Sequence, residues 1–170
     1  MEMGAKSRFN LELHSFRCNC IAGLANTFTC NMSRLAPNRY SLSGLVELHR
    51  PMHPNAEIAI YVHYKLPTAN RRIKFMDLRL KLCDVMSSVQ RMPVVRNILV
   101  EIRRSSNFPL TCPFKEHVMY NLSNMIITNE IIPPYVPHHH VNVSLQFYEQ
   151  QLQIAYYNVS GSVIPKSIKG

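Results

Sequence analysis

The chain has 170 residues, enough for one domain that buries a sizeable core. Its net charge of +9 favours anionic partners, or is simply a solvated basic surface. The basic residues are dispersed with no long run, and no interleaving of aromatic and basic residues suggests a platform for stacking bases, which argues against a nucleic-acid surface. No apolar run approaches the roughly 20 residues of a membrane-spanning helix.

The N-terminal part of the chain is predicted to form strands. Apolar and polar residues alternate from Phe9 to His14, which indicates a strand. The segment 1–8 before it is predicted to be disordered. Residues Thr27–Ser33 are also β-prone, and we expect them to form a hairpin with the first strand across a turn at Gly23.

The next three segments also alternate with period two. Tyr40–His49 and Glu57–Leu66 flank the proline-containing turn at 50–55, and we expect them to pair as a meander hairpin. A further strand is predicted from Ile73 to Cys83.

The pattern then changes to a helical period. Apolar residues at i, i+3, i+4 and i+7 predict one short helix near 93–105, with Pro93 in its first turn. The apolar face consists of Val95, Ile98, Leu99 and Ile102. The other face carries Arg96, Arg103 and Arg104, which would either be solvated or contact an anionic membrane surface.

The C-terminal part returns to period two. Extended segments are predicted at Val118–Thr128, 141–147 and Leu152–Val159, with a proline-rich loop before the last two and a tail at 165–170. Many short strands and one helix predict a mainly β fold. We expect a single immunoglobulin-like, two-sheet β-sandwich over residues 9–164.

Cysteine usage suggests an oxidising compartment. The spacing of Cys18 and Cys20 is C-x-C, which is not that of zinc or thioredoxin-type sites. We expect Cys18 to pair with Cys30, with Cys20–Cys30 as the alternative. A second disulfide, Cys83–Cys112, would stabilise the fold by roughly 3–4 kcal/mol. The other reading is a cytosolic basic protein with free thiols.

Four N-x-[ST] sequons also favour a secreted glycoprotein. They lie at Asn31, Asn121, Asn142 and Asn158. The first ten residues contain no apolar stretch of the kind found in signal peptides. We therefore expect an extracellular protein whose leader is missing from this chain.

Several short motifs follow one another along the chain: Phe16-Arg17-Cys18, Cys30, Tyr40-Ser41-Leu42, the strand ending at Cys83, Cys112-Pro113, Tyr120 and the two closing strands. In this order they resemble the insect DUF1091 family, which is itself similar to the MD-2-related lipid-recognition (ML) domain. The resemblance covers about Phe9 to Ile164. It implies an ML-type sandwich whose sheets part to admit an apolar ligand. It brings no catalytic residues, and some relatives act in chemosensation.

Apolar positions on the predicted strands are the candidate ligand lining. They are Ile58, Ile60, Val62, Tyr64, Leu78, Leu80, Leu145, Phe147 and Ile154. With such a pocket the protein would sequester a lipid, fatty acid or hydrocarbon through the hydrophobic effect. The same residues also fit an ordinary packed core. In that case the protein would be an extracellular interaction module that contacts a receptor.

The sequence contains no motif that indicates an enzyme or a cofactor site. The chain has neither G-x-S-x-G nor H-E-x-x-H, and only ten acidic residues. The histidines at 138–140 with His117, or His49 with His53, are the candidate metal ligands. Flanking prolines prevent a helical ligand pair at either place. We predict no enzyme activity, no cofactor and no metal site.

Overall fold

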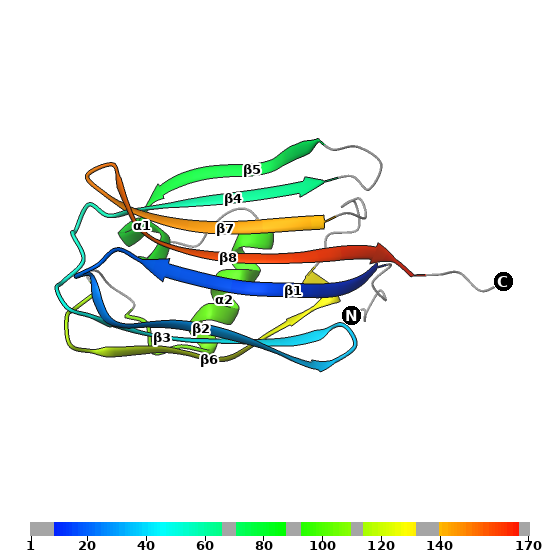
Figure 1. Ribbon diagram of the computed structural model, residues 1–170, viewed down its shortest axis with the longest axis horizontal. Coiled ribbons are helices and arrows are strands. Elements are labelled where there is room, and N and C mark those ends of the chain that lie inside the picture. The colour runs from blue at the N-terminus through cyan, green and yellow to red at the C-terminus, as the bar shows by residue number, and fades with distance from the viewer. Residues whose placement is uncertain (1–8, 66–70, 88–92, 110–113, 132–139, 167–170) are drawn as a thin grey trace.

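The computed structural model describes residues 9–65, 71–87, 93–109, 114–131 and 140–166, and these form two antiparallel sheets (Figure 1). The large sheet has the order β1 (Phe9–Cys20), β8 (Leu152–Pro165), β7 (His140–Glu149), β4 (Glu57–Lys65), β5 (Arg72–Lys81). The small sheet has the order β2 (Ala25–Ala36), β3 (Arg39–Leu48), β6 (Met119–Thr128). The predicted mainly β, two-sheet sandwich is confirmed. The predicted disordered segment 1–8 lies outside the described residues.

The helix predicted near 93–105 is confirmed as α2 (Pro93–Arg104). A second helix, α1 (Leu82–Ser87), and a 3-10 turn, η1 (Asn129–Ile131), were not predicted. The predicted strand to Cys83 is therefore two residues too long. The Leu82 N–H donates to Ala56 O at 2.9 Å, and Leu82 and Val85 pack on Ala56 and Ile58. This packing turns the chain out of the sheet.

Both predicted hairpins are wrong, because each pair of consecutive strands is divided between the sheets. β1 pairs with β8, whereas β2 pairs with β3. β3 also pairs with β6, whereas β4 pairs with β5 and β7. The turn at 50–55 is thus a crossing between sheets. Alternation along a strand identifies its buried face but leaves its hydrogen-bonding partner open.

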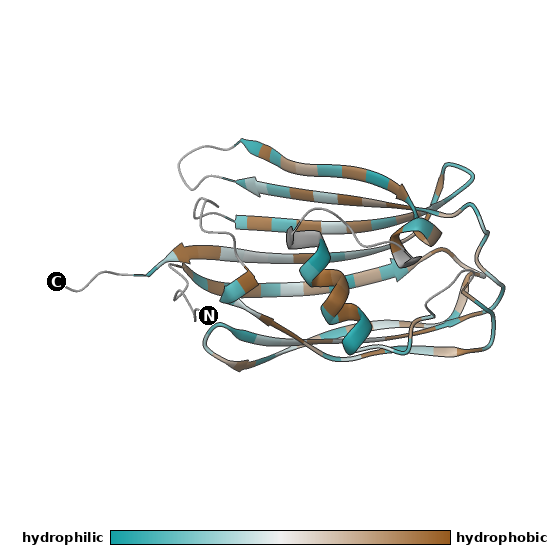
Figure 2. Ribbon diagram, turned by 180° about the vertical axis from the view of Figure 1, so that it is seen from behind, coloured by the Kyte–Doolittle hydropathy of each residue, from teal (hydrophilic) through white to brown (hydrophobic). Residues whose placement is uncertain are grey.

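The core of the described residues consists of three clusters. The first is built on Leu24, Leu48, Ile154 and Ala155. The second is built on Ala56, Ile58, Leu82 and Val85, and it shares Met52, Phe114 and Phe147 with the first. The third is built on Leu11, Tyr40 and Val163. Figure 2 shows apolar and polar residues alternating as bands along the strands.

Candidate functional site

The predicted ligand-lining residues of the large sheet share one face. Residues directly opposite in an antiparallel pair point to the same side. Ile58 is opposite both Leu80 and Phe147, and Ile60 is opposite both Leu78 and Leu145. Among the nine predicted residues only Ile58 and Ile154 are buried, and the other seven are half-buried. The structure therefore places the residues of β4, β5 and β7 together on the inner face, and it places Ile154 in the first core cluster. Their role as a ligand lining stays a prediction.

A row in the middle of this face is apolar but incompletely covered. Val62 is opposite Val143, which is opposite Val159, which is opposite Phe16. All four side chains are half-buried. The three clusters of the described core include none of these four residues. Sequence reasoning missed the row as a unit because the strand partners were unknown, although alternation around 141–147 marked Val143.

Aromatic side chains border this row on one side. The Tyr157 ring lies 5.9 Å from that of Phe16, 5.3 Å from Phe28 and 6.0 Å from Phe147. Burial raises the pKa of Tyr157 well above its ordinary value, with a smaller contribution from the charge of Cys20. The Tyr157 hydroxyl therefore stays protonated at neutral pH in an apolar environment.

Helix α2 lies across the sheets on one side, behind the strands in Figure 1 and in front of them in Figure 2. Its residues Ile98, Leu99 and Ile102 are half-buried, and Leu99 packs against the second cluster. The predicted apolar face is confirmed for these three residues, while the side chain of Val95 lies outside the description. The helix acts as a partial cover.

The three arginines of α2 are exposed, as the sequence predicted. Arg104 pairs with Glu101 at 3.0 Å, one turn earlier on the helix. Their contact with an anionic membrane surface remains a prediction. No helix among the described residues is long and apolar enough to cross a membrane.

The Cys18–Cys30 disulfide is confirmed, with a Cα–Cα distance of 6.2 Å. It joins β1 of the large sheet to β2 of the small sheet. The alternative Cys20–Cys30 is excluded, because Cys20 is a free, half-buried thiol whose pKa is raised by burial. Cys83 is disulfide-bonded, and its predicted partner Cys112 lies outside the described residues.

All four sequon asparagines lie on outer faces. Asn31 and Asn121 alternate with inward residues of the small sheet, and Asn142 and Asn158 with inward residues of the large sheet. On β7 and β8 the sequons are paired crosswise. Asn142 is opposite Ser160, and Ser144 is opposite Asn158. A glycan at any of the four positions would project away from the core.

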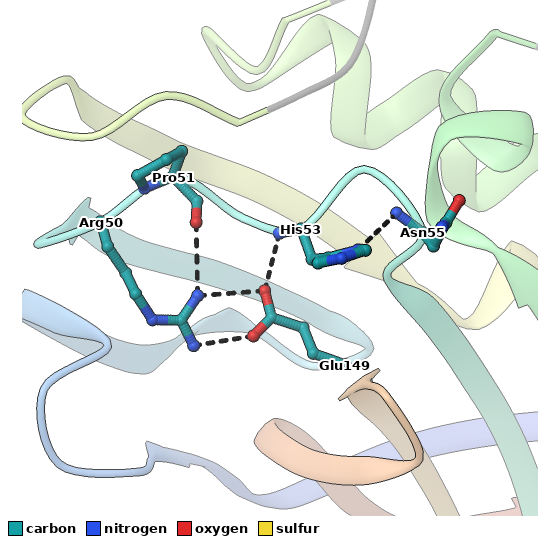
Figure 3. A network of polar contacts seen from close by, with 5 residues as sticks. All are labelled: Arg50, Pro51, His53, Asn55 and Glu149. Carbon is teal, nitrogen blue, oxygen red and sulfur yellow. Dashed lines mark hydrogen bonds and ion pairs between the residues drawn. The ribbon is translucent and has the colours of Figure 1, made fainter.

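A polar network at one end of the sandwich was not predicted (Figure 3). Glu149, at the end of β7, accepts hydrogen bonds from Arg50 at 2.7 and 3.2 Å and from the His53 backbone N–H at 2.7 Å. A hollow of about 440 Å³ opens beside it. Its lining consists of Arg50, Pro51, Met52, His53, Pro54, Glu149 and Gln150. Arginine and carboxylate compensate each other here, so the network chiefly fastens the 50–55 crossing to β7.

The Glu149 carboxylate responds to two opposed effects. Burial raises its pKa, but the hydrogen bonds from Arg50 and from the His53 backbone lower it more, so the net pKa lies below its ordinary value. A carboxyl group whose pKa is lowered on folding stabilises the protein above its unfolded pKa. That contribution is lost as the pH falls through the folded pKa.

We expect Glu149→Gln to lower the free energy of unfolding by about 1–2 kcal/mol at pH 7, because a largely buried charged acceptor is lost. The difference from wild type should shrink as the pH falls toward 3. Urea denaturation across this pH range measures it. Glu57→Gln is the control. Both side chains of the Glu57–Arg79 ion pair are exposed, so this pair should contribute at most about 1 kcal/mol to the free energy of unfolding. Equal effects of both substitutions at every pH would show that the Arg50–Glu149 pair does not fasten the 50–55 crossing to β7.

Comparison with known families gives one relevant match. The model of a family described as a protein of unknown function (DUF1091) matches residues 57–143, about half of the chain. The match covers β4, β5, both α-helices and β6, and it ends within β7. A search of curated proteins finds no match.

Proposed function

The chain belongs to the DUF1091 family, and on this premise we propose that it is a secreted binding protein that sequesters a small apolar ligand. A lipid, fatty acid or hydrocarbon fits the chemistry of the inner face. The observation that carries the proposal is the row Val62, Val143 and Val159. These residues point inward and are apolar, yet they are only half-buried and belong to none of the three core clusters.

The energetics favour an occupant with an alkyl chain. Each CH₂ group moved from water into this environment contributes about 0.8 kcal/mol. A ligand would also complete the burial of Val62 and its neighbours, which packing between the sheets leaves unfinished. The inward row offers no charged side chain, so the ligand is held without specific ion pairs. Similarity to the ML lipid-recognition sandwich is part of this proposal.

Secretion belongs to the same proposal. The inter-sheet disulfide Cys18–Cys30 requires an oxidising compartment to form and persist. The outward placement of the four sequons allows glycans that leave the interior accessible. Exposed Arg96 on α2 would face an anionic membrane during ligand uptake or delivery.

Native mass spectrometry of the chain secreted from insect cells behind an added signal peptide tests the proposal. We expect a stoichiometric apolar adduct that organic extraction removes and that fatty acids or hydrocarbons restore. A clean mass that such a panel leaves unchanged would reject ligand binding. It would favour the alternative, an interaction module with a solid core.

A matched pair of variants locates the ligand. Val62→Trp fills the middle of the inner face and should lower the adduct fraction at least tenfold, because the added ring occupies the volume that the ligand would take. Tyr61→Trp introduces the same indole ring on the outer face of the same strand and should leave binding unchanged. Circular dichroism and the melting temperature check that both variants fold. Equal loss of binding in the two variants would place the ligand elsewhere.

A further inference from the structure

Two histidines on the outer face of the large sheet direct one ring nitrogen each at the same serine oxygen. His14 Nε2 lies 2.8 Å and His140 Nδ1 lies 3.1 Å from Ser162 Oγ. The two ring centroids are 6.0 Å apart. Both histidines are exposed, whereas Ser162 is only 9% exposed. The three side chains come from β1, β8 and β7, and neither the core nor the inner face uses them.

The backbone of β1 sets the direction of His14. Leu13 is opposite Gly161 and Ser15 is opposite Ser160, so His14 is the extra residue of a β-bulge. A Cβ on Gly161 would lie 2.6 Å from Glu12 O, which shows how closely β1 approaches β8 at this point. Bulges commonly redirect a side chain and are frequent beside functional sites.

We propose that His14 and His140 bind a late first-row divalent ion, Zn²⁺ or Cu²⁺. Imidazole nitrogen suits these ions, with metal–nitrogen distances of about 2.0–2.1 Å. Two rings on one ion have centroids at most roughly 6.4 Å apart, since each ring centre lies about 3.2 Å from the metal. The observed 6.0 Å separation meets this limit.

The surroundings define the kind of site. Glu12 is opposite Ser162, and Lys65 is opposite His140, so one anion and one cation flank the pair. The described residues hold no group of three or more His, Cys, Asp or Glu side chains placed for a metal. The site therefore has two protein nitrogens, with Ser162 and water completing the shell. It binds an exchangeable ion, which ties the edge strand β1 to β7.

Isothermal titration of the metal-free full chain with Zn²⁺ tests this proposal. We expect one equivalent in the wild type, and at least tenfold weaker binding in His14→Asn and in His140→Asn. Binding to the folded state should also raise the melting temperature of the wild type alone. In the wild type, the electron paramagnetic resonance spectrum of Cu²⁺ should show two coupled nitrogens, a readout that needs no variant.

A second histidine pair supplies the control. The rings of His49 and His117 lie 6.1 Å apart but edge-on at 85°, and His49 Nδ1 bonds Asn26 Oδ1. His117→Asn suits the φ of +58° at that position and should leave metal binding unchanged.

Three results would overturn the proposal. The first is Zn²⁺ binding of wild-type affinity in His14→Asn. The second is binding that disappears in a His138→Asn/His139→Asn variant but persists in His14→Asn, because the histidine run in the sequence would then be the ligand. The third is the absence of any binding by the wild type. None of these results bears on the apolar ligand, which is measured separately.

Discussion

Leu48→Ala is expected to lower the free energy of unfolding by about 2–5 kcal/mol. Leu48 is only 1% exposed and belongs to the first core cluster, with Leu24 and Ile154. The substitution removes buried methyl groups and leaves a cavity that the surrounding strands fill only in part. Its backbone is also fixed, because Leu48 O accepts the His117 N–H at 2.9 Å. The site therefore has little freedom to collapse.

Leu45→Ala on the same strand is the control. Leu45 is 40% exposed on the outer face of the small sheet, so the same chemical change should cost less than about 1 kcal/mol. Urea denaturation of both variants, with the m-value checked against wild type, gives the comparison. A loss in Leu48→Ala no larger than that in Leu45→Ala would show that the cluster around Leu48 is not closely packed.

Replacing both Cys18 and Cys30 with alanine is expected to lower the free energy of unfolding by about 3 kcal/mol. In the chain-entropy model, a loop of about a dozen residues contributes this much by restricting the unfolded chain. The bond is also a covalent link between β1 and β2, which belong to different sheets and share no ladder. Its removal should therefore loosen the sandwich, which hydrogen exchange of β2 amides would detect.

The double substitution is needed because Cys18→Ala alone would leave Cys30 able to pair with Cys20. Cys20→Ala serves as the control, since it removes a half-buried free thiol and keeps the disulfide. We expect it to cost less than about 1 kcal/mol. Urea denaturation of the wild type, the double variant and Cys20→Ala without reductant measures the three free energies of unfolding. Wild-type stability in the double variant would mean that packing alone holds the sheets together.

Sequence reasoning succeeded where the signal is local. Period-two alternation identified the inward residues around Ile60 and Leu145, because a strand directs successive side chains to opposite faces. The i, i+3, i+4, i+7 pattern located α2 to within a residue at its C-terminal end. The Cys18–Cys30 pair was expected as well, although the rival Cys20 was excluded only by the structure.

Most contacts that sequence reasoning missed join residues that are distant in sequence. The Arg50–Glu149 pair joins residues 99 positions apart, and His14 contacts Ser162, which is 148 positions away. For each of these side chains the sequence offers many other polar residues that could equally well be its partner. Only the strand order β1-β8-β7 brings the two histidines to one serine. Sequence spacing carries no record of that order.

The sequence by itself determined the mainly β class, the helix at Pro93–Arg104 and the inward faces of the strands, because each depends on the chemistry of nearby residues. The tertiary structure alone decided which strands pair, and it separated β3 from β4 and β1 from β2. It also ended β5 at Lys81, where Leu82 packs on Ile58. The physical reason is that backbone hydrogen bonds between strands are alike for any sequence, so their partners are chosen by the packing of the whole chain.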